Sequence, residues 1–578
     1  MIFYGKASRF EPTAAVLDEI EGWIDEAEVE TVLPIERHGA WTAALIAAGG
    51  LAQSLADASS EDGEAAALAL ATQLAAVMGA SFDSGFADQP GHRPVPVSEA
   101  LATLRSLSDL PDEIEIRRPE GFAHYAAYPE AYWRAAARLD APAPTRVLGL
   151  RSIGSTLAPV VAAALRSSPA ETVRPEGHPF ARTIAVSPAK AKVMREGADA
   201  VWAVVDEGPG LSGSSIGAAA DALACAGVPP ERLVLFPSHD GEPGAMASLK
   251  HRHLWSRART TVCSFEDLWL DRPEHGLAAW VEDITGPLVA PPEDVAGGAW
   301  RRHRFADEVD WPAVDRQNER RKYLLTGQNG AFLLRFTGLG RFGRDKFQRA
   351  TALAEAGFGL EPLGWRHGFL IERWRHDLEP LSPVALDRPT LLRRLGDYLA
   401  FRARAFPAAV GDGASLDALL AMARVNSAEM LGEAAGRQVD GWSSALPRLT
   451  AVARPVATDG RLAAHEWLSD RGGILLKTDS LDHCCGHDLV GCQDIAWDIA
   501  GAEAEYALSD REVDDLSAAV ARSGCDCHPD LLAVLRIAYP AFRVGALSMA
   551  RDRETGAEAE RLSAALSVQV EALRRALG

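Results

Sequence analysis

Apolar positions recur every three or four residues through much of the first 140 residues, the spacing typical of amphipathic helices. The segments 14–28 and 41–58 show this spacing most clearly, and the polar stretch DASSEDGEAA (57–66) predicts an exposed connection between helices. We therefore expect residues 1–140 to form a helical N-terminal region that acts as a cap or docking surface.

The pattern changes at Thr145. Short, almost wholly apolar runs lie at 145–150, 200–205 and 233–236, and the first two lead through a short loop into a helical pattern. Strands that alternate with helices predict a parallel sheet covered on both faces. We expect a Rossmann-like α/β domain over residues 141–275.

A Pro/Gly-rich stretch, PLVAPPEDVAGG (287–298), predicts a linker over residues 276–310. The segment 321–336 then alternates like a β-hairpin that turns at GQNG, and helical patterns dominate 391–435 and 505–577. Strands first and helices later predict an α+β domain over residues 311–578, so the whole chain is a multidomain α/β and α+β protein.

Composition narrows the functional classes. The chain has 578 residues, of which 47% are apolar, and a formal charge of −21, which argues against a groove that follows nucleic-acid phosphates. No apolar run approaches the roughly 20 residues of a membrane span, and no basic segment precedes a long apolar one at the start. Seven cysteines without a regular framework fit a reducing compartment. We expect a cytoplasmic protein with small-molecule ligands, no membrane contact and a homodimer as an open possibility.

The most informative segment follows the apolar run 200–205. Asp206 and Glu207 come directly after it, and a loop of Gly, Pro and Ser then leads into a helix. Ligands of a doubly wound sheet bind beyond the carboxyl ends of its strands, and a helix N-terminus holds phosphate with backbone N–H groups. The two acids suit ribose hydroxyls or Mg²⁺. This arrangement predicts a sugar-phosphate site.

The segment resembles the phosphoribosyl-diphosphate (PRPP) motif of type I phosphoribosyltransferases, with a loop one residue longer. The resemblance implies that Asp206 and Glu207 are the catalytic acids and that Mg²⁺ assists the displacement of diphosphate at the ribose carbon. The implied PRPP-binding residues are Arg151, Ser152 and Gly154 in the diphosphate loop, with Ser212, Gly213, Ser214 and Ser215 around the 5′-phosphate. An ordinary strand–helix turn in a Rossmann-like domain without PRPP stays an alternative.

Two flanking segments are less specific. Arg174, His178 and Arg182 lie between the two loops and belong either to a mobile flap or to a solvated loop. Residues 120–132, with three tyrosines, form either a hood over the acceptor or ordinary aromatic core.

A second group of acids lies at 459–498. Asp459 and His465 precede a short hairpin that turns at DRGG, and Asp479 ends the return strand. Such a layout brings a base and metal ligands around one phosphoryl group. Asp494 and Asp498 follow near a helix start, where an acid is a good cap.

This region resembles the aminoglycoside-phosphotransferase-like, protein-kinase-like enzymes, which have two lobes. The resemblance implies Asp459 as the base, Asp479 and His465 around the metal, and Asp498 as a structural cap. A rival alignment takes Asp479 as the base and Asp494 as the metal ligand. Arg335 stands where the ATP-binding Lys is expected, and Glu355 is its candidate ion-pair partner. The usual His-Gly-Asp triplet is absent, and His replaces Asn.

Three cysteines and a histidine at 484–492, together with Cys525, Cys527 and His528, offer zinc ligands without a standard spacing, so reduced cysteines beside a loop are preferred. His483, His487 and Asp488 are further candidates for substrate contacts.

Together these features predict a bifunctional enzyme. PRPP-dependent phosphoribosyl transfer is combined with ATP-dependent phosphorylation of a small nucleotide-like metabolite, with Mg²⁺ as cofactor and PRPP and ATP as substrates. The alternative from another class is a PRPP- or nucleotide-binding sensor or scaffold with an inactive kinase-like domain. Hydrolysis or phosphorolysis of a nucleotide at the PRPP-type site is a third possibility.

Overall fold

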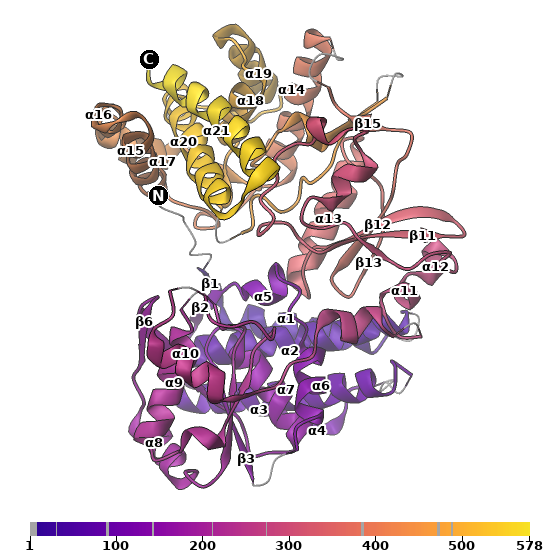
Figure 1. Cartoon of the computed structure of the whole chain (residues 1–578), viewed down its shortest axis with the longest axis vertical. Helices are drawn as coiled ribbons and strands as arrows, with labels where there is room; N and C mark the ends of the chain where they lie inside the picture. Colours follow the sequence, from indigo (N-terminus) through magenta and orange to yellow (C-terminus); the bar gives the residue numbers. More distant parts are fainter. Residues whose placement is uncertain are drawn as a thin grey trace.

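The computed structural model describes residues 8–29, 32–87, 92–140, 144–210, 212–244, 246–272, 274–382, 387–470, 474–486 and 489–578. It has a lower half, which runs to about residue 285, and an upper half formed by the rest of the chain (Figure 1).

The lower half is built on a five-stranded parallel sheet, as the apolar runs predict. The strand order is β4-β3-β7-β8-β9, and every pair is parallel. The strands are β3 (Thr145–Leu150), β4 (Glu171–Val173), β7 (Val201–Val205), β8 (Leu233–Phe236) and β9 (Arg259–Thr260). Central β7 is wholly buried because it is covered on both faces, and this is why its sequence shows no polar alternation.

Helices surround this sheet. Those between its strands are α7 (Gly154–Leu165), α8 (Pro188–Glu196), α9 (Ser214–Cys225) and α10 (Leu249–Arg257). The N-terminal region supplies α1 (Thr13–Ala27), α2 (Pro34–Asp57), α3 (Glu61–Asp83), α4 (Val95–Ser106), α5 (Glu120–Ala123) and α6 (Pro129–Ala137). Helices α2, α3 and α6 contact α7, so the N-terminal region forms one layer over the sheet. Its helical content agrees with the prediction, and the pair β1 (Ser8–Pro12) and β2 (Glu113–Arg117) is an addition.

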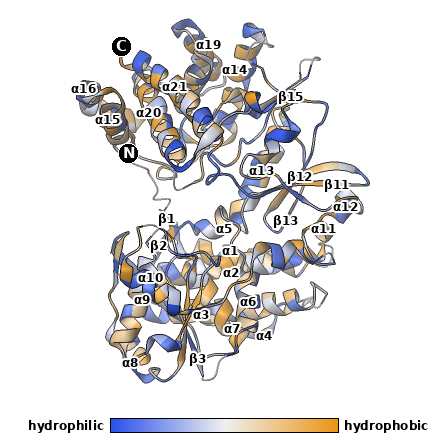
Figure 2. Cartoon of the chain, viewed as in Figure 1, coloured by the Kyte–Doolittle hydropathy of each residue, from blue (hydrophilic) through white to orange (hydrophobic). Residues whose placement is uncertain are grey.

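Helices α3 and α20 (Pro529–Arg553) are long and apolar enough to pass a length test for a membrane span, which the sequence analysis did not expect. More than half of the residues in each apolar stretch are buried inside the folded chain. Helices α2, α3 and α7 carry largely hydrophobic colours in Figure 2, consistent with inner helices of a core.

The upper half begins with a five-stranded antiparallel sheet in the order β10-β11-β12-β14-β13. Its strands are β10 (Glu293–Asp294), β11 (Lys322–Gly327), β12 (Gly330–Phe336), β13 (Pro362–Arg366) and β14 (Phe369–Arg373), with α13 (Arg341–Glu355) between β12 and β13. The predicted hairpin at GQNG pairs Lys322 with Arg335 and Gly327 with Gly330.

A helical part completes the upper half, giving the two-lobed layout expected for residues 311–578. Its helices are α14 (Arg388–Ala405), α15 (Leu416–Leu431), α16 (Glu433–Asp440), α17 (Leu446–Val452), α18 (Ala496–Tyr506), α19 (Asp510–Arg522), α20 and α21 (Gly556–Leu577). Short strands join it: β15 (Glu379–Pro380), β17 (Trp467–Ser469) and β18 (Leu475–Lys477) form one sheet, and β16 (Pro455–Val456) pairs with β19 (Gln493–Asp494).

Residues 276–310 are not the free linker that their Pro/Gly content predicts. They contain α11 (Leu277–Trp280), α12 (Glu282–Thr285), β10 and a 3₁₀ helix at Ala299–His303. Arg301 is buried and pairs with Glu558 of α21 at 2.9 Å. The segment therefore links the upper sheet to the last helix.

One apolar core spans both halves. It includes Trp41 from α2, Trp269 from the end of the lower half, and Tyr323, Phe336 and Phe369 from the upper sheet. The upper sheet thus packs directly on the lower half, which fixes the two halves relative to each other.

Candidate functional sites

The predicted sugar-phosphate segment lies at the carboxyl ends of β7 and β8. A cavity of about 560 Å³ opens there. Asp206, Glu207 and Gly208 form one wall, and Tyr128, Tyr132 and Phe265 form another. The structure thus brings the predicted acids to a crevice above the sheet. Tyr128 and Tyr132 beside it are almost wholly buried in the core, which agrees with the alternative of aromatic core packing, and they also line the crevice as the hood alternative requires.

Burial raises the pKa of Asp206 to about 6, and the backbone N–H of Glu207 only partly offsets that effect. The Tyr132 hydroxyl donates to the backbone carbonyl of Asp206 at 2.9 Å, so the hood is fixed to the acid loop. The backbone carbonyl of Glu207 accepts from the hydroxyl of Ser238 at 2.8 Å. A Cβ on Gly121 of α5 would lie 2.4 Å from Cδ1 of Ile153 and 3.0 Å from Cδ of Glu207, so α5 approaches both side chains closely at this glycine.

The predicted phosphate loop enters α9 through Gly213, whose φ of +59° favours glycine. The hydroxyls of Ser212 and Ser214 both donate to the backbone carbonyl of Pro179, at 2.8 and 2.6 Å. Pro179 lies at the turn between β5 (Pro175–His178) and β6 (Ala181–Ile184). This hairpin is the predicted flap segment, and its turn lies on the phosphate loop. Ser215 follows in the first turn of α9.

The predicted diphosphate loop lies beside the strand that leads to the acids. A Cβ on Gly154 would come 2.8 Å from the carbonyl of Val205, so the loop approaches β7 as closely as a glycine allows. Ser152, with φ of 147°, precedes it.

Arg151 does not face the crevice. Its guanidinium contacts Asp57 and Glu64 of the N-terminal helices, each at 3.4 Å, and Nε donates to Thr172. Arg174 also pairs with Asp57. Two acids of the N-terminal layer attract both arginines, so the prediction that Arg151 supplies charge to a diphosphate is wrong for this arrangement.

The second group of acids lies at a cleft of about 560 Å³ between the upper sheet and the helical part. Trp300, Lys322, Arg335, Trp374, Glu466 and Asp479 are among the residues that line it. Arg335 lies on β12, as predicted, and contacts Asp479 at 3.1 Å and Glu372 at 3.5 Å.

Asp459, the predicted base, is enclosed in the structure. Its side chain has 0% exposure, and Lys477, Arg402 and the hydroxyl of Tyr398 surround it. Burial alone would raise its pKa, but Lys477, His483 and Arg402 bring the pKa down to about 2. A base must reach the substrate proton, and in this arrangement the enclosed Asp459 carboxylate contacts only groups of the chain, so its role as the base stays a prediction.

Asp498 is a structural cap, but not of its own helix. Its carboxylate accepts from the backbone N–H groups of Asp459 and Gly460, at 2.7 and 2.8 Å. The rival metal ligand Asp494 accepts from the backbone N–H groups of Arg454 and Ala496 instead of facing the cleft.

Arg461 and Glu466 occupy the cleft side of this loop. They pair at 2.8 Å, and Lys477 contacts Glu466 at 2.9 Å. The predicted metal ligand His465 stacks on Trp300 and lies 3.1 Å from Arg461 through Nε2. Burial and the charges of Arg461 and Lys477 hold the pKa of His465 well below its usual value. His465 is thus an acceptor for Arg461 in this arrangement.

Glu355 is exposed at the end of α13 and is not the partner of Arg335. The α13 residue near the cleft is Lys346, which is buried and pairs with Asp482. Asp479 remains as an acid at the cleft, and its pKa is well below the usual range because Lys322, His483 and Arg335 outweigh its burial.

Sequence reasoning missed the cations Lys322, Lys346 and Lys477. A charged residue inside an apolar run was the available signal, because Lys477 ends the run Ile474–Leu476. Among the described residues, the cysteines of the zinc alternative form no cluster of metal ligands, and all seven cysteines are free. The candidates His487 and Asp488 lie outside the described residues.

No family model and no curated protein matches the chain. The solved structures that it resembles include small-molecule kinases. A choline/ethanolamine kinase family protein from Mesorhizobium loti is 15% identical over 52% of this chain and 96% of its own, with a TM-score of 0.33. The macrolide 2′-phosphotransferase MphH from Brachybacterium faecium is 16% identical over 46% and 96%, with a TM-score of 0.30. The choline kinase LicA from Streptococcus pneumoniae is 13% identical over 43% and 89%, with a TM-score of 0.31. At these values the likeness assigns no activity to this chain.

Proposed function

We propose that the chain is a PRPP-dependent transferase whose reaction takes place in the crevice at the carboxyl end of β7. The observation that carries the proposal is the pair Asp206 and Glu207 at the mouth of a ligand-sized cavity. Among the described residues, no Lys or Arg forms an ion pair with Asp206. A partly buried carboxylate without a cation suits a ligand that brings hydroxyl groups or a metal ion to it.

Different residues around the acids would contact the ribose, the 5′-phosphate and the acceptor base. The ribose hydroxyls face Asp206 and Glu207, and the 5′-phosphate takes the place of the Pro179 carbonyl as acceptor for Ser212 and Ser214. An acceptor base packs against Tyr128, Tyr132 and Phe265. A nitrogen of the acceptor then bonds to the ribose carbon while the carbon–oxygen bond to diphosphate breaks, and diphosphate leaves with the electron pair.

The site fits Mg²⁺, because two neighbouring carboxylates are the hard oxygen donors that this ion prefers. Bound there with the ligand, Mg²⁺ would offset the charge of the departing diphosphate. Asp206 and Glu207 are the residues that would hold it.

The decisive experiment incubates the purified chain with PRPP, Mg²⁺ and a panel of nucleobases and small amines. Diphosphate release is recorded, and the products are identified by mass spectrometry. A ribosylated acceptor supports transfer, whereas ribose 5-phosphate alone supports hydrolysis. Binding of PRPP without turnover supports a sensor. The proposal fails if PRPP with Mg²⁺ neither raises the melting temperature nor releases diphosphate.

We propose ATP-dependent phosphorylation of a small molecule in the upper cleft as a second candidate function. Lys322 and Arg335 supply positive charge for phosphates, and Asp479 supplies an oxygen ligand for Mg²⁺. Phosphoryl transfer depends mainly on positioning and charge, so it does not strictly require Asp459 as a base. We expect ATP to bind and to turn over slowly. Calorimetry with ATP and Mg²⁺ tests this, with loss of binding expected for Asp479→Asn; no heat of binding for the unchanged chain would refute it.

A further inference from the structure

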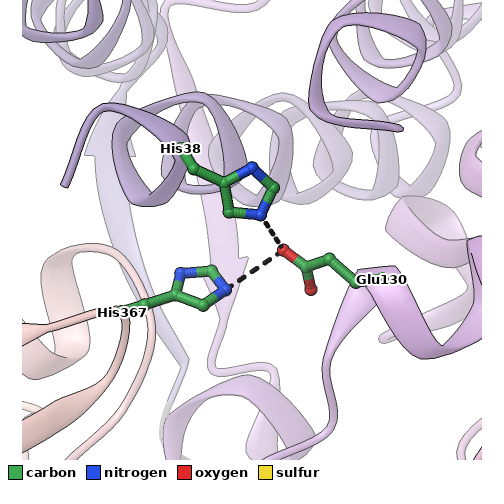
Figure 3. Close-up of side chains that lie close together, drawn as sticks. All are labelled: His38, Glu130 and His367. Carbon is green, nitrogen blue, oxygen red and sulfur yellow. Dashed lines mark hydrogen bonds and ion pairs between the residues drawn. The ribbon is translucent and has the colours of Figure 1, made fainter. Parts of the chain in front are cut away.

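Three buried side chains from distant parts of the chain meet where the two halves join. His38 lies in α2, Glu130 in α6, and His367 in the turn between β13 and β14 (Figure 3). Both imidazole rings point at the same carboxylate oxygen: Nε2 of His38 is 2.8 Å and Nε2 of His367 is 3.1 Å from Oε1 of Glu130. The side chains of His38 and Glu130 have 0% exposure, and that of His367 has 1%.

The surroundings supply little charge to balance this carboxylate. Ring centroids of Phe86, Trp280 and Tyr128 lie 4.7 to 5.4 Å from one or other imidazole. Within the described part of the chain, no Lys or Arg forms an ion pair with Glu130. Burial alone would raise the pKa of Glu130, yet His367 and His38 bring that pKa well below the usual range. A buried carboxylate between two imidazoles needs positive charge at the same place, which either a proton on an imidazole or a metal ion between the rings can supply.

The donor atoms have capacity left for a metal ion. Oε2 of Glu130 and Nδ1 of His367 are buried and have no hydrogen-bond partner among the residues that the structure describes. Nδ1 of His38 contacts the Ser81 hydroxyl at 2.9 Å, which fixes the ring with Nε2 toward Glu130. If both carboxylate oxygens of Glu130 bind the ion together with Nε2 of each histidine, the three residues supply four donor atoms.

We propose that His38, Glu130 and His367 bind a divalent transition-metal ion of the zinc class. Two imidazole nitrogens with a carboxylate are a donor set that zinc prefers over magnesium or calcium. The three ligand atoms lie within 4.8 Å of one another. Donors about 2.0–2.1 Å from a tetrahedral zinc ion lie roughly 3.3 Å apart, so the observed 2.8 and 3.1 Å need only small outward shifts.

A second trio shows what an already neutralised cluster looks like. Asp459, Glu466 and His483 lie equally close together. There the ammonium group of Lys477 sits 3.3 Å from Asp459 and 2.9 Å from Glu466, so the cation is part of the chain. Among the residues that the structure describes, no lysine pairs with Glu130, which is why the proposal applies to the first cluster alone.

The position of the ion would connect the two halves. Glu130 lies on the same short helix as Tyr132, which lines the lower crevice, and His367 belongs to the upper sheet. The hydroxyl of Tyr128 also donates to the backbone carbonyl of His367 at 2.8 Å. A metal ion bound here would hold the aromatic wall of the crevice against the upper sheet. The inference does not depend on what the crevice binds.

The test measures metal in the purified full-length chain. After loading with Zn²⁺ and dialysis, elemental analysis should find about one zinc ion per chain, reduced at least tenfold in His38→Gln and His367→Gln. His376→Gln, which changes an exposed histidine, is the matched control and should keep the metal. No bound zinc in the unchanged chain, or equal zinc in all variants, overturns the proposal.

If the histidine variants do not fold, binding of Co²⁺ to the unchanged chain still tests the proposal. The unchanged chain loaded with Co²⁺ should show visible bands of a four-coordinate ion without a thiolate charge-transfer band. A strong thiolate band would assign the ion to cysteines, and absence of the visible bands would exclude the site. A chelator should also lower the melting temperature, and Zn²⁺ but not Mg²⁺ should restore it. A melting temperature that the chelator leaves unchanged also counts against the proposal.

Discussion

The lower crevice and the upper cleft have the same volume, about 560 Å³, yet their charges are arranged differently. In the upper cleft, Asp479 lies 3.1 Å from Arg335, and Glu466 lies 2.9 Å from Lys477. In the lower crevice, Asp206 has no Lys or Arg as an ion-pair partner among the described residues, and its pKa is raised. Buried paired carboxylates depend on their cationic partners, whereas a carboxylate in a crevice with a raised pKa and no cationic partner is a candidate for a functional site.

The local sequence explains much of the difference in ion pairing between the acids of the two sites. No Lys or Arg occurs between Arg195 and Arg232, and Arg321, a cation that lines the lower crevice, pairs with Glu266. The upper cleft draws on a segment rich in Lys and Arg at 316–349. Under the proposed function, ligand binding at the lower crevice depends on the two acids, whereas Asp479 and Glu466 of the upper cleft already have cationic partners within the chain.

The largest effect is expected when the two acids of the lower crevice lose their charge. Asp206→Asn combined with Glu207→Gln should lower diphosphate release from PRPP about a hundredfold or more, because the sugar hydroxyls and Mg²⁺ lose their ligands. A coupled assay for diphosphate measures this. Glu231→Gln, on the exposed 3₁₀ helix before β8, is the control and should keep full activity. Activity within twofold of the unchanged chain would show that the acids have no part in the reaction.

The paired acids of the upper cleft should instead report on stability. Lys477→Met would leave Asp459 and Glu466 buried without their shared cation and should lower the free energy of unfolding by about 3–5 kcal/mol. Urea unfolding followed by tryptophan fluorescence would show the loss in the transition of the upper half. Lys250→Met removes an exposed pair with Asp221 and should change little. Equal effects of the two substitutions would remove the contrast between the two regions.

Local patterns were enough to predict the parallel sheet. They also predicted the unit in which β7 is followed by Asp206, a Gly-rich loop and α9. Buried strands next to Gly-rich loops leave a clear trace in the sequence, and Gly213 marks the left-handed entry to α9. The Pro/Gly content of 276–310 was misleading because Trp280 and Arg301 are buried there. Their partners lie far along the chain, where no local pattern indicates them.

The charge partners were the least predictable part of both sites. Arg151 is drawn to Asp57 and Glu64, about ninety positions away, and only the folded N-terminal layer brings them together. Asp459 has the residue type of a base, but its environment is set by Tyr398 and Arg402 on α14. A sequence shows which groups ionise, whereas the fold decides which of them are neutralised.

A smaller effect is expected from pH on ligand binding. Because the pKa of Asp206 is raised to about 6, affinity for PRPP with Mg²⁺ should fall as the pH drops from 8 through 6 and should be about tenfold weaker at pH 5. Phosphate groups of the ligand also take up protons near pH 6. Asp206→Asn provides the baseline, since its weaker binding follows the ligand alone. Calorimetric titrations at four pH values compare the two, and parallel curves would contradict the role of Asp206.

The smallest effect is that of Asp206→Asn on the free energy of unfolding. Its sign shows whether Asp206 is an acid available to a ligand or one that stabilises the fold. The pKa of Asp206 is about 6 in the folded chain and 3.8 ordinarily, so the folded state binds this proton more tightly than the unfolded state does. Ionised Asp206 therefore costs stability above pH 6, and the cost shrinks as the pH falls from 6 to 4. The full shift corresponds to roughly 3 kcal/mol, but the buried amide of Asn also carries a burial cost, so Asp206→Asn should be more stable than the unchanged chain by about 1 kcal/mol at pH 8, with no gain at pH 4. Melting curves at the two pH values measure the difference, with the exposed Asp199→Asn as control. An Asn variant that is less stable at pH 8 would mean that the carboxylate already holds the loop together, as the paired acids do in the upper cleft.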